Sequence, residues 1–344
     1  MAPDQPLVAS TAEKQRGNSL RPTAWGIATT VILLGVLLVA TLLNLAPARQ
    51  TAGWALAYTL LRVAPPLLLS LIEHLARPAG PRKSGARWLL HFQILLANYA
   101  CAIPFDVAAA FLAATLVKVL GFNLGFIDLR VADGRGVLAV MGAFLISTLI
   151  GDFFFYWYHR SLHKSHILWQ HHKMHHLDPE FDALTGPRQN WLESFFSVFF
   201  ISIPMAVLFK FDSLDAFAMG VVNGTIVGVL QSVVFINHSN LRLQFGRASV
   251  LLVSSQTHRI HHSYLKPHLD KNFVAFFPIW DIVFGTYYHP ARDEFPPTGV
   301  EGEKEIESVW EVQIFPLREW WKMFRARPGR SSRGSGARSP TAKC

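Results

Sequence analysis

The stretch HRSLHKSHILWQHHKMHH, residues 159 to 176, follows directly on a long apolar run and places seven histidines within eighteen positions. Within it His159 and His163 are four residues apart. His172, His175 and His176 occupy positions i, i+3 and i+4. The word HRIHH at 258–262 repeats that second spacing. Since positions i, i+3 and i+4 share one face of a helix, each cluster is predicted to be helical, with its imidazoles on one side.

Apolar runs surround these clusters. The chain is 51% hydrophobic and only 16% charged, and Trp25–Ala46 and Ala216–Ile236 contain no charged side chain. Each is long enough to cross about 30 Å of hydrocarbon as a helix. Four further runs lie at 52–75, 89–120 (interrupted by a proline and an aspartate), 137–158 and 191–209. We therefore expect an all-α polytopic membrane protein with about four to six transmembrane helices and a cytosolic helical cap that carries the histidines. A cleaved signal peptide is the competing interpretation of the first run, but further apolar runs follow it.

The basic residues indicate orientation. The net charge is +9, but Lys and Arg collect beside the apolar runs and at the C-terminus, which favours membrane lipid over nucleic acid as the partner. With the N-terminus in the cytoplasm and the runs at 191–209 and 216–236 forming an antiparallel hairpin, 159–189 and 237–290 both face the cytoplasm. The two histidine-rich regions can then build one site.

A metal explains the clusters best, because packed neutral imidazoles gain nothing and protonated ones repel one another. The only cysteines are Cys101 and Cys344, so the ligands are nitrogen or oxygen. A single catalytic zinc typically takes three protein ligands, whereas eight clustered histidines, with His238 as a ninth candidate, suffice for two metal ions. Imidazole suits iron, copper and zinc alike. A histidine-rich site beside a bilayer favours iron that activates dioxygen to oxidise a lipid C–H bond.

With the patterns HRSLH, HKMHH and HRIHH in this order, the chain resembles the fatty acid hydroxylase / sterol desaturase superfamily of integral membrane di-iron enzymes. The flanking words DFFFYWYHR, NHSNLRL (237–243) and NFVAFFPIWDIVFGTYYHP (272–290) match as well, so the resemblance covers about 145–290. It implies two non-haem iron ions, O2 as co-substrate and lipid hydroxylation or desaturation. The iron ligands that it implies are His159, His163, His172, His175, His176, His258, His261 and His262, with His238 as an additional ligand.

Four residues near these ligands are candidates for orienting them through a ring N–H or water: Asp152, His166, Asn272 and Asp281. A capping or turn role is the alternative for each carboxylate and for the asparagine, and His166 could simply be exposed. His171, His268 and His289 are outside the motifs.

The chain is expected to divide into five parts: a polar basic segment (1–23), an N-terminal transmembrane region (24–130), the catalytic domain (131–290), a cytosolic or interfacial segment (291–327) and a disordered tail (328–344). In the fourth part, apolar residues recur at helical spacing among basic ones, which suits either an interfacial helix or a packed surface helix. No haem attachment motif, ferredoxin cysteine set or GxGxxG word occurs, so electrons are expected from an external cytochrome, ferredoxin or reductase.

Two other functions remain open from the sequence. A zinc-dependent membrane hydrolase could use the same histidines, with Glu193 or Asp178 as the general base. A non-enzymatic metal-binding transporter or sensor is the other, but its histidines should lie within the spans along a pore.

Overall fold

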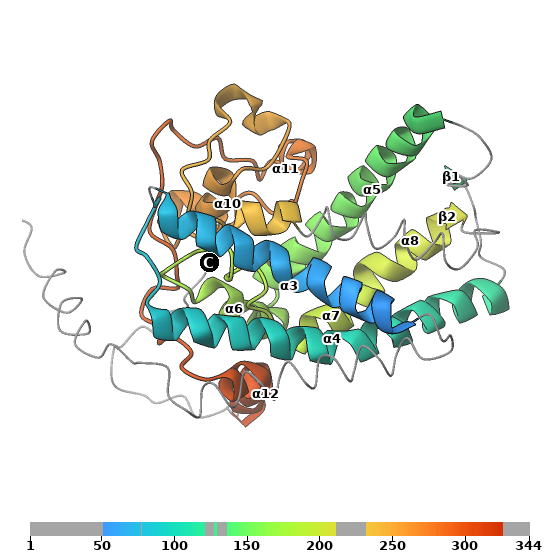
Figure 1. Cartoon of the computed structure of the whole chain (residues 1–344), viewed down its shortest axis with the longest axis horizontal. Helices are drawn as coiled ribbons and strands as arrows, with labels where there is room; N and C mark the ends of the chain where they lie inside the picture. The colour runs from blue at the N-terminus through green and yellow to red at the C-terminus, as the bar shows by residue number, and fades with distance from the viewer. Residues whose placement is uncertain (1–50, 77, 121–126, 129–135, 211–231, 326–344) are drawn as a thin grey trace, which may run out of the picture.

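A computed structural model describes residues 51–76, 78–120, 127–128, 136–210 and 232–325. The long helices α3 (Thr51–Leu75), α4 (Gly85–Leu120) and α5 (Gly136–Lys164) extend to one side of a cap of shorter helices and loops (Figure 1). Several predicted segments lie wholly or mostly outside the described residues. These are the first and sixth apolar runs, the loop of the predicted hairpin, and the segments 1–23 and 328–344.

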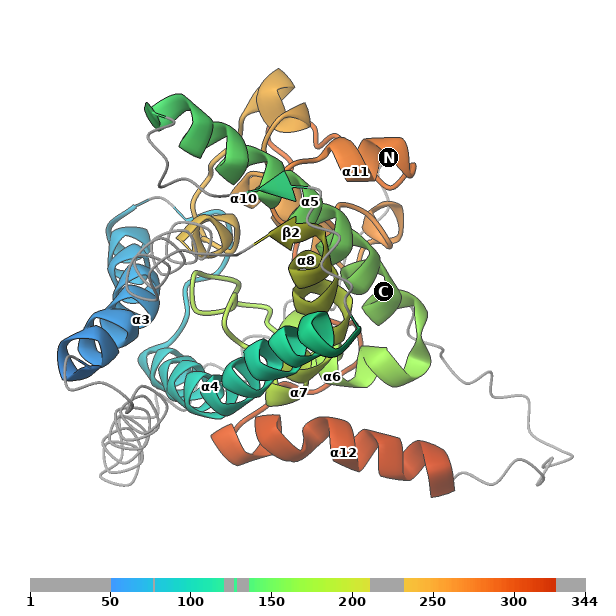
Figure 2. The ribbon, with the colours of Figure 1, turned by 90° about the vertical axis from the view of Figure 1, so that its right-hand side faces the viewer.

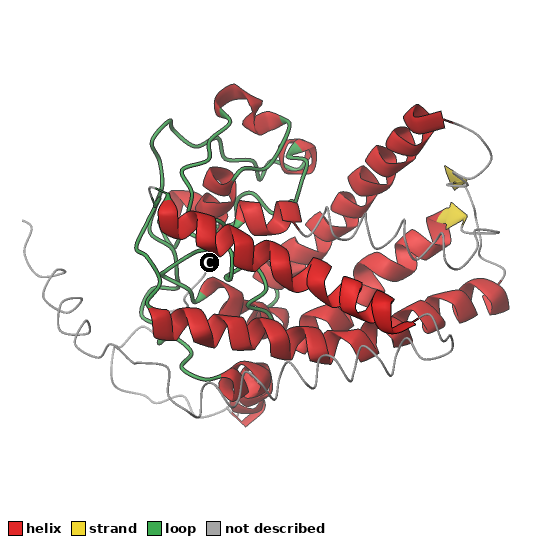
Figure 3. Ribbon diagram, in the orientation of Figure 1, coloured by secondary structure: helices red, strands yellow, loops and turns green. Residues whose placement is uncertain are grey.

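The remaining elements are shorter than these three helices. In chain order they are α6 (His166–His176), α7 (Trp191–Ser197), the π-helix η2 (Val198–Ser202), α8 (Ile203–Leu208), η3 (Gly246–Val250), α10 (Ser255–His261), η4 (Lys266–His268), α11 (Ile279–Val283) and α12 (Val309–Arg325). Two short strands, β1 (Ile127–Asp128) and β2 (Phe209–Lys210), pair in parallel. Figure 3 shows that helices dominate, so the predicted all-α class is confirmed apart from this one pair.

Local sequence explains where the histidine-bearing helices begin and end. Ser165 caps α6 by accepting a hydrogen bond from the backbone N–H of Leu168, and the Asp178-Pro179 pair follows the end of that helix. Ser254 and Thr257 form a reciprocal capping box at the start of α10. These caps fix the register in which each helix presents its histidines.

The core of the cap lies between α4, α6 and α12. Ile94, Leu95 and Leu96 of α4 pack in one buried cluster with Met174 of α6 and Val312 of α12. A smaller cluster joins α5 to the segment before α11 and includes Tyr156 and Phe273. Burial of these apolar side chains holds the helices together and surrounds the histidines.

The prediction of four to six spans is not confirmed. Within the described ranges one helical stretch, Met141–Lys164, is long and apolar enough to cross a membrane, and Val63–Leu75 and Trp191–Met205 are shorter apolar helices. Part of the expected third span packs against protein, since the buried residues 94–97 of α4 belong to the core of the cap. The helix also continues through Pro104, although an interruption was expected there.

Candidate metal centre

Nine histidines from four segments converge inside the cap. His159 and His163 lie at the C-terminal end of α5, and α6 carries the HKMHH cluster. The HRIHH cluster occupies α10 and its C-cap residue, and His238 follows the helical residues 232–237. The structure therefore brings together all nine residues that the sequence singled out as candidate ligands.

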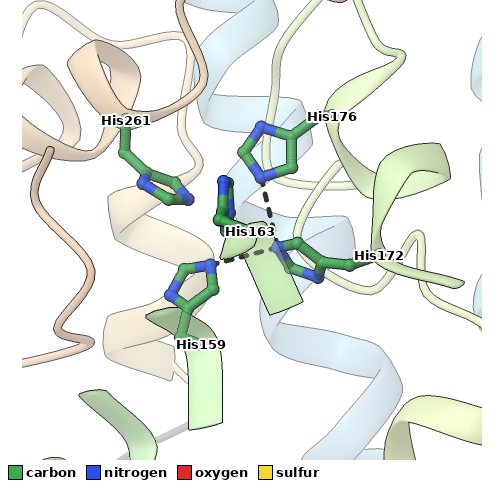
Figure 4. A group of neighbouring side chains, drawn as sticks. All are labelled: His159, His163, His172, His176 and His261. Carbon is green, nitrogen blue, oxygen red and sulfur yellow. Dashed lines mark hydrogen bonds between the residues drawn. The ribbon is translucent and has the colours of Figure 1, made fainter. Parts of the chain in front are cut away.

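The nine rings form two groups, and within each group one nitrogen per ring lies within 4.8 Å of all the others. The first group contains His159, His163, His172, His176 and His261, and the second contains His175, His238, His258 and His262. Figure 4 shows the rings of the first group turned toward one another. Each HxxHH cluster is divided between the groups, because its i and i+4 members stay together and the i+3 member joins the other group. Each group is thus built from several helices.

Hydrogen bonds on the outer ring nitrogens fix the orientation of several histidines. The Nδ1–H of His159 donates to the backbone carbonyl of Phe273 at 2.6 Å, and that of His261 donates to the carbonyl of Lys271 at 2.9 Å. The Nδ1–H of His172 donates to the carboxylate of Glu193 at 3.0 Å. In the second group the Nδ1–H of His238 donates to the carbonyl of Val234 at 2.7 Å. Each neutral ring therefore presents the lone pair of Nε2 to the interior of its group.

These lone pairs need a cation. The Nε2 atoms of His159 and His172 lie 3.0 Å apart, although both carry lone pairs when Nδ1 holds the proton (Figure 4). The Nε2 atom of His261 and both ring nitrogens of His163 are buried without a hydrogen-bond partner. Two nitrogens about 2.1 Å from one metal ion and at right angles around it would be about 3.0 Å apart. The donor set therefore fits a metal ion in the first group.

The second group has the same character. The Nε2 of His238 lies 3.1 Å from that of His175 and 2.8 Å from that of His258, which in turn lies 3.2 Å from that of His262. Burial lowers the pKa of His238 to about 4, and burial together with neighbouring imidazoles lowers the pKa of His258 and His262. Protons are therefore poor candidates for the cation that these nitrogens would share, and the donor set fits a metal ion here too.

A cavity of about 460 Å³ adjoins both groups. His159 and His172 of the first group and His175, His238 and His258 of the second lie in its wall. Most of its other lining residues are apolar or small, including Phe155, Ile201, Met205, Phe235 and Phe276. Such a space accommodates an alkyl chain beside the metal-binding nitrogens.

Several residues between positions 73 and 99, which precede the histidine motifs, also build the site. Asn98 and Tyr99 of α4 line the cavity. The Glu73 carboxylate accepts hydrogen bonds from the backbone N–H groups of Ala183 and Asn240, which follow the second cluster and His238 in the sequence. The ammonium group of Lys83 lies 2.9 Å from Asp178 and 2.7 Å from Asp182. These contacts make α3 and α4 part of the same unit as the histidines.

Of the four residues expected to orient ligands, three are buried and one is exposed. Asp152, Asn272 and Asp281 are buried, and their described hydrogen bonds go to groups other than histidine rings. The two carboxylates accept from backbone N–H groups of 273–277, and the Asn272 amide bonds to backbone groups of Thr257 and Tyr288. His166 is exposed in the first turn of α6. The neighbouring His171 is buried, its Nδ1–H donates to the carbonyl of Leu168, and burial lowers its pKa to about 4.

Sequence reasoning missed the partners of the ring N–H groups. Glu193 was considered only as a general base, yet its carboxylate accepts from His172. Its position in the first turn of α7, twenty-one residues after His172, gave no spacing signal. The backbone carbonyls of Val234, Lys271 and Phe273 could not be identified from side-chain chemistry.

Comparisons with known proteins agree with the motifs. Residues 144–286 match the family model described as fatty acid hydroxylase. The chain is 29% identical over 186 residues to the alkylglycerol monooxygenase of Homo sapiens. This match covers 52% of this chain and 37% of that protein. It is 24% identical over 166 residues to the ornithine lipid hydroxylase OlsE of Rhizobium tropici, 46% of each chain. A very-long-chain aldehyde decarbonylase, GL1-5 of Oryza sativa subsp. indica, is 24% identical over 209 residues, 57% of this chain and 31% of that protein. The matches thus span less than half the length of these relatives. No solved structure matches the chain.

Proposed function

Because the chain belongs, through residues 144–286, to the fatty acid hydroxylase superfamily, we propose that it is a membrane-bound, O2-dependent, non-haem di-iron oxidoreductase that hydroxylates or desaturates a lipid C–H bond. The observation that carries this proposal is the pair of buried imidazole groups beside an apolar cavity. The names of the relatives, a monooxygenase and a lipid hydroxylase, favour hydroxylation.

Five histidines of the first group and four of the second would hold the two iron ions. When bound, the iron pair supplies the activation of dioxygen that C–H oxidation requires. In the overall hydroxylation, one oxygen atom enters the C–H bond and the other becomes water, with two electrons and two protons. An external cytochrome, ferredoxin or reductase would provide these electrons.

The protein's own contribution is to orient ligands and to exclude water. Glu193 and the carbonyls of Lys271, Phe273 and Val234 hold protons on Nδ1, so that Nε2 remains free to bind metal. Phe155, Phe235 and Phe276 line the cavity with apolar surface. That surface would hold a long alkyl chain with one C–H bond close to the oxidising centre.

Lipids in which a long chain joins a polar group are the proposed substrates. The cavity wall is mainly apolar but includes Asn98, Gln189 and Asn237. Amide groups beside apolar side chains can bind the polar group of a lipid while its chain occupies the rest of the space. The names alkylglycerol monooxygenase and ornithine lipid hydroxylase describe relatives with substrates of this general kind.

We place the catalytic domain at 131–290, anchored by α5, with the histidine groups facing the cytoplasm. The exposed apolar residues of α12 (Trp310, Ile314, Leu317, Trp321 and Phe324) recur along one helix face. Its other face packs against α4 and α6 through Val312 and Phe315. In Figure 1 α12 is seen end-on while α4 runs lengthwise, and Figure 2 shows α12 from the side. This crossing direction suits a helix lying in the membrane interface, with Trp321 at headgroup depth.

The hydrolase alternative loses support from the contacts of its two candidate bases. Glu193 binds the ring of His172, and Asp178 binds Lys83 and Thr185. Neither carboxylate is free to activate water. The transporter alternative expects ligands spaced along a pore, whereas these rings form two compact groups.

The test compares the wild-type chain with a His175→Ala/His176→Ala variant, which removes one ligand from each group. His166→Ala is the matched control, since His166 lies on the same helix but is exposed. Iron per chain would be measured on purified protein, and 18O incorporation into cellular lipids would be followed by mass spectrometry under 18O2. We expect labelled lipid with the wild type and the control but not with the double variant. Zinc in place of iron, together with O2-independent turnover, would refute the proposal.

A further inference from the structure

The segment 271–277 connects the third histidine cluster to α11, and two of its backbone carbonyls orient ligands of the first group. The carbonyl of Lys271 accepts from His261 on α10, and the carbonyl of Phe273 accepts from His159 on α5. These two histidines come from helices that are about a hundred residues apart in sequence. One short segment therefore sets the relative orientation of two rings.

Asn272 lies between these carbonyls in a left-handed conformation, with φ of 56°. Asparagine tolerates this region better than most side chains because its amide can bond locally. Its Oδ1 accepts from the backbone N–H of Tyr288 at 2.8 Å, and its Nδ2 donates to the carbonyls of Thr257 and Tyr288. The backbone N–H of Asn272 donates to Thr286. The peptide whose carbonyl faces His261 is thus held from its other side.

Asp281 holds the second peptide. Its Oδ1 accepts from the backbone N–H of Phe273 at 2.9 Å, and its Oδ2 accepts from that of Val274 at 3.1 Å. The Thr286 hydroxyl donates to Oδ1 at 2.6 Å, which fixes the carboxylate itself. Asp281 and Asn272 are 1% and 4% exposed, so water cannot readily replace these bonds.

We propose that Asn272 and Asp281 are positioning residues for the metal ion of the first group, and that they act on His261 and His159 through the carbonyls of Lys271 and Phe273. This inference rests on the metal-binding part of the proposed function. In the second group, the described contact on a ring Nδ1 is instead that of His238 with Val234. The effect of these residues is therefore selective for one of two metal ions.

The experiment measures metal content and release on the full-length chain purified in detergent. Asp281→Ala removes both acceptors, and Asp281→Asn keeps one acceptor oxygen. Asn272→Gly removes the side-chain amide but still tolerates the left-handed backbone conformation. Asn272→Leu removes the amide and disfavours that conformation. Asp293→Ala is the matched control, because Asp293 is an exposed carboxylate in the loop after α11. Metal per chain would be determined by mass spectrometry, and release into a chelator would be followed in time.

We expect two metal ions per chain in the wild type and in Asp293→Ala, each released at the wild-type rate. In Asp281→Ala and Asn272→Leu one ion should be released about 10 to 100 times faster, or be lost on purification, while the other keeps its wild-type rate. Asp281→Asn and Asn272→Gly should be intermediate, which a general loss of folding would not produce. The inference is overturned if both ions change together, or if neither changes. A wild-type chain without metal would overturn the proposed function as well, so the two failures are distinguishable.

Discussion

Replacing Lys83 by methionine tests whether α3 and α4 form one folded unit with the histidine-bearing cap. Lys83 lies in the connection between these helices, with its side chain only 3% exposed. Its ammonium group lies 2.9 Å from Asp178, 2.7 Å from Asp182 and 2.7 Å from Nδ1 of His91. Methionine fills a similar volume but carries no charge, so the change would leave two buried carboxylates without their main cation.

The magnitude follows from the cost of breaking a buried ion pair by removing one partner, about 3 to 5 kcal/mol. Arg188 compensates little, because its Nη1 is 3.9 Å from Asp178. At about 2 °C per kcal/mol for a long chain, the apparent melting temperature should fall by about 6 to 10 °C. Arg82→Met, which removes an exposed neighbouring charge, should change the free energy of unfolding by no more than about 0.5 kcal/mol.

The loss should also depend on pH. Burial raises the pKa of Asp182 above its usual range, and Lys83 opposes that rise. Without Lys83 the folded chain keeps a proton that the unfolded chain releases above about pH 4. Stability of the variant should then fall as the pH rises, so the destabilisation is smaller at pH 5 than at pH 8.

Thermal unfolding in detergent at both pH values would measure these differences. The double variant Lys83→Met/Asp182→Asn should recover part of the lost stability, because one unpaired carboxylate is removed together with the cation. An unchanged melting temperature in Lys83→Met, or a double variant that melts lower still, would refute the reasoning.

Three further predictions concern the ligands and the membrane. Glu193→Ala should weaken the first group's metal affinity about 10- to 100-fold in a chelator competition. Glu193→Gln should weaken it less, since glutamine keeps an acceptor for His172. A metal affinity equal to that of the wild type in Glu193→Ala would contradict this prediction. Gly186→Ala should speed release of the second group's metal, because a Cβ would lie 3.1 Å from Nδ1 of His238. Gly142→Ala is the control, since a Cβ there meets nothing within 4 Å. Equal release rates in the two variants would argue against the prediction. A spin label at Trp321 of the chain in lipid nanodiscs should be more accessible to O2 than to a polar nickel reagent, with the reverse at Lys322; the same pattern at both sites would exclude an interfacial α12.

The sequence by itself determined the helical class and the identity of the nine converging histidines. Both depend on local spacing, because the i, i+3, i+4 pattern places the rings of one cluster on one helix face whatever the rest of the chain does. The order of HRSLH, HKMHH and HRIHH also indicated the resemblance to fatty acid hydroxylases, and the family model matches residues 144–286.

Only the tertiary structure decided how these histidines are shared and held. The division of each HxxHH cluster between two groups depends on how α5, α6 and α10 cross, which no single helix specifies. The ring N–H partners are Glu193 and three backbone carbonyls, and every residue has a carbonyl, so sequence chemistry cannot distinguish the ones that matter. The apolar residues 94–96 illustrate the same limit, since burial in lipid and burial in a protein core favour the same side chains.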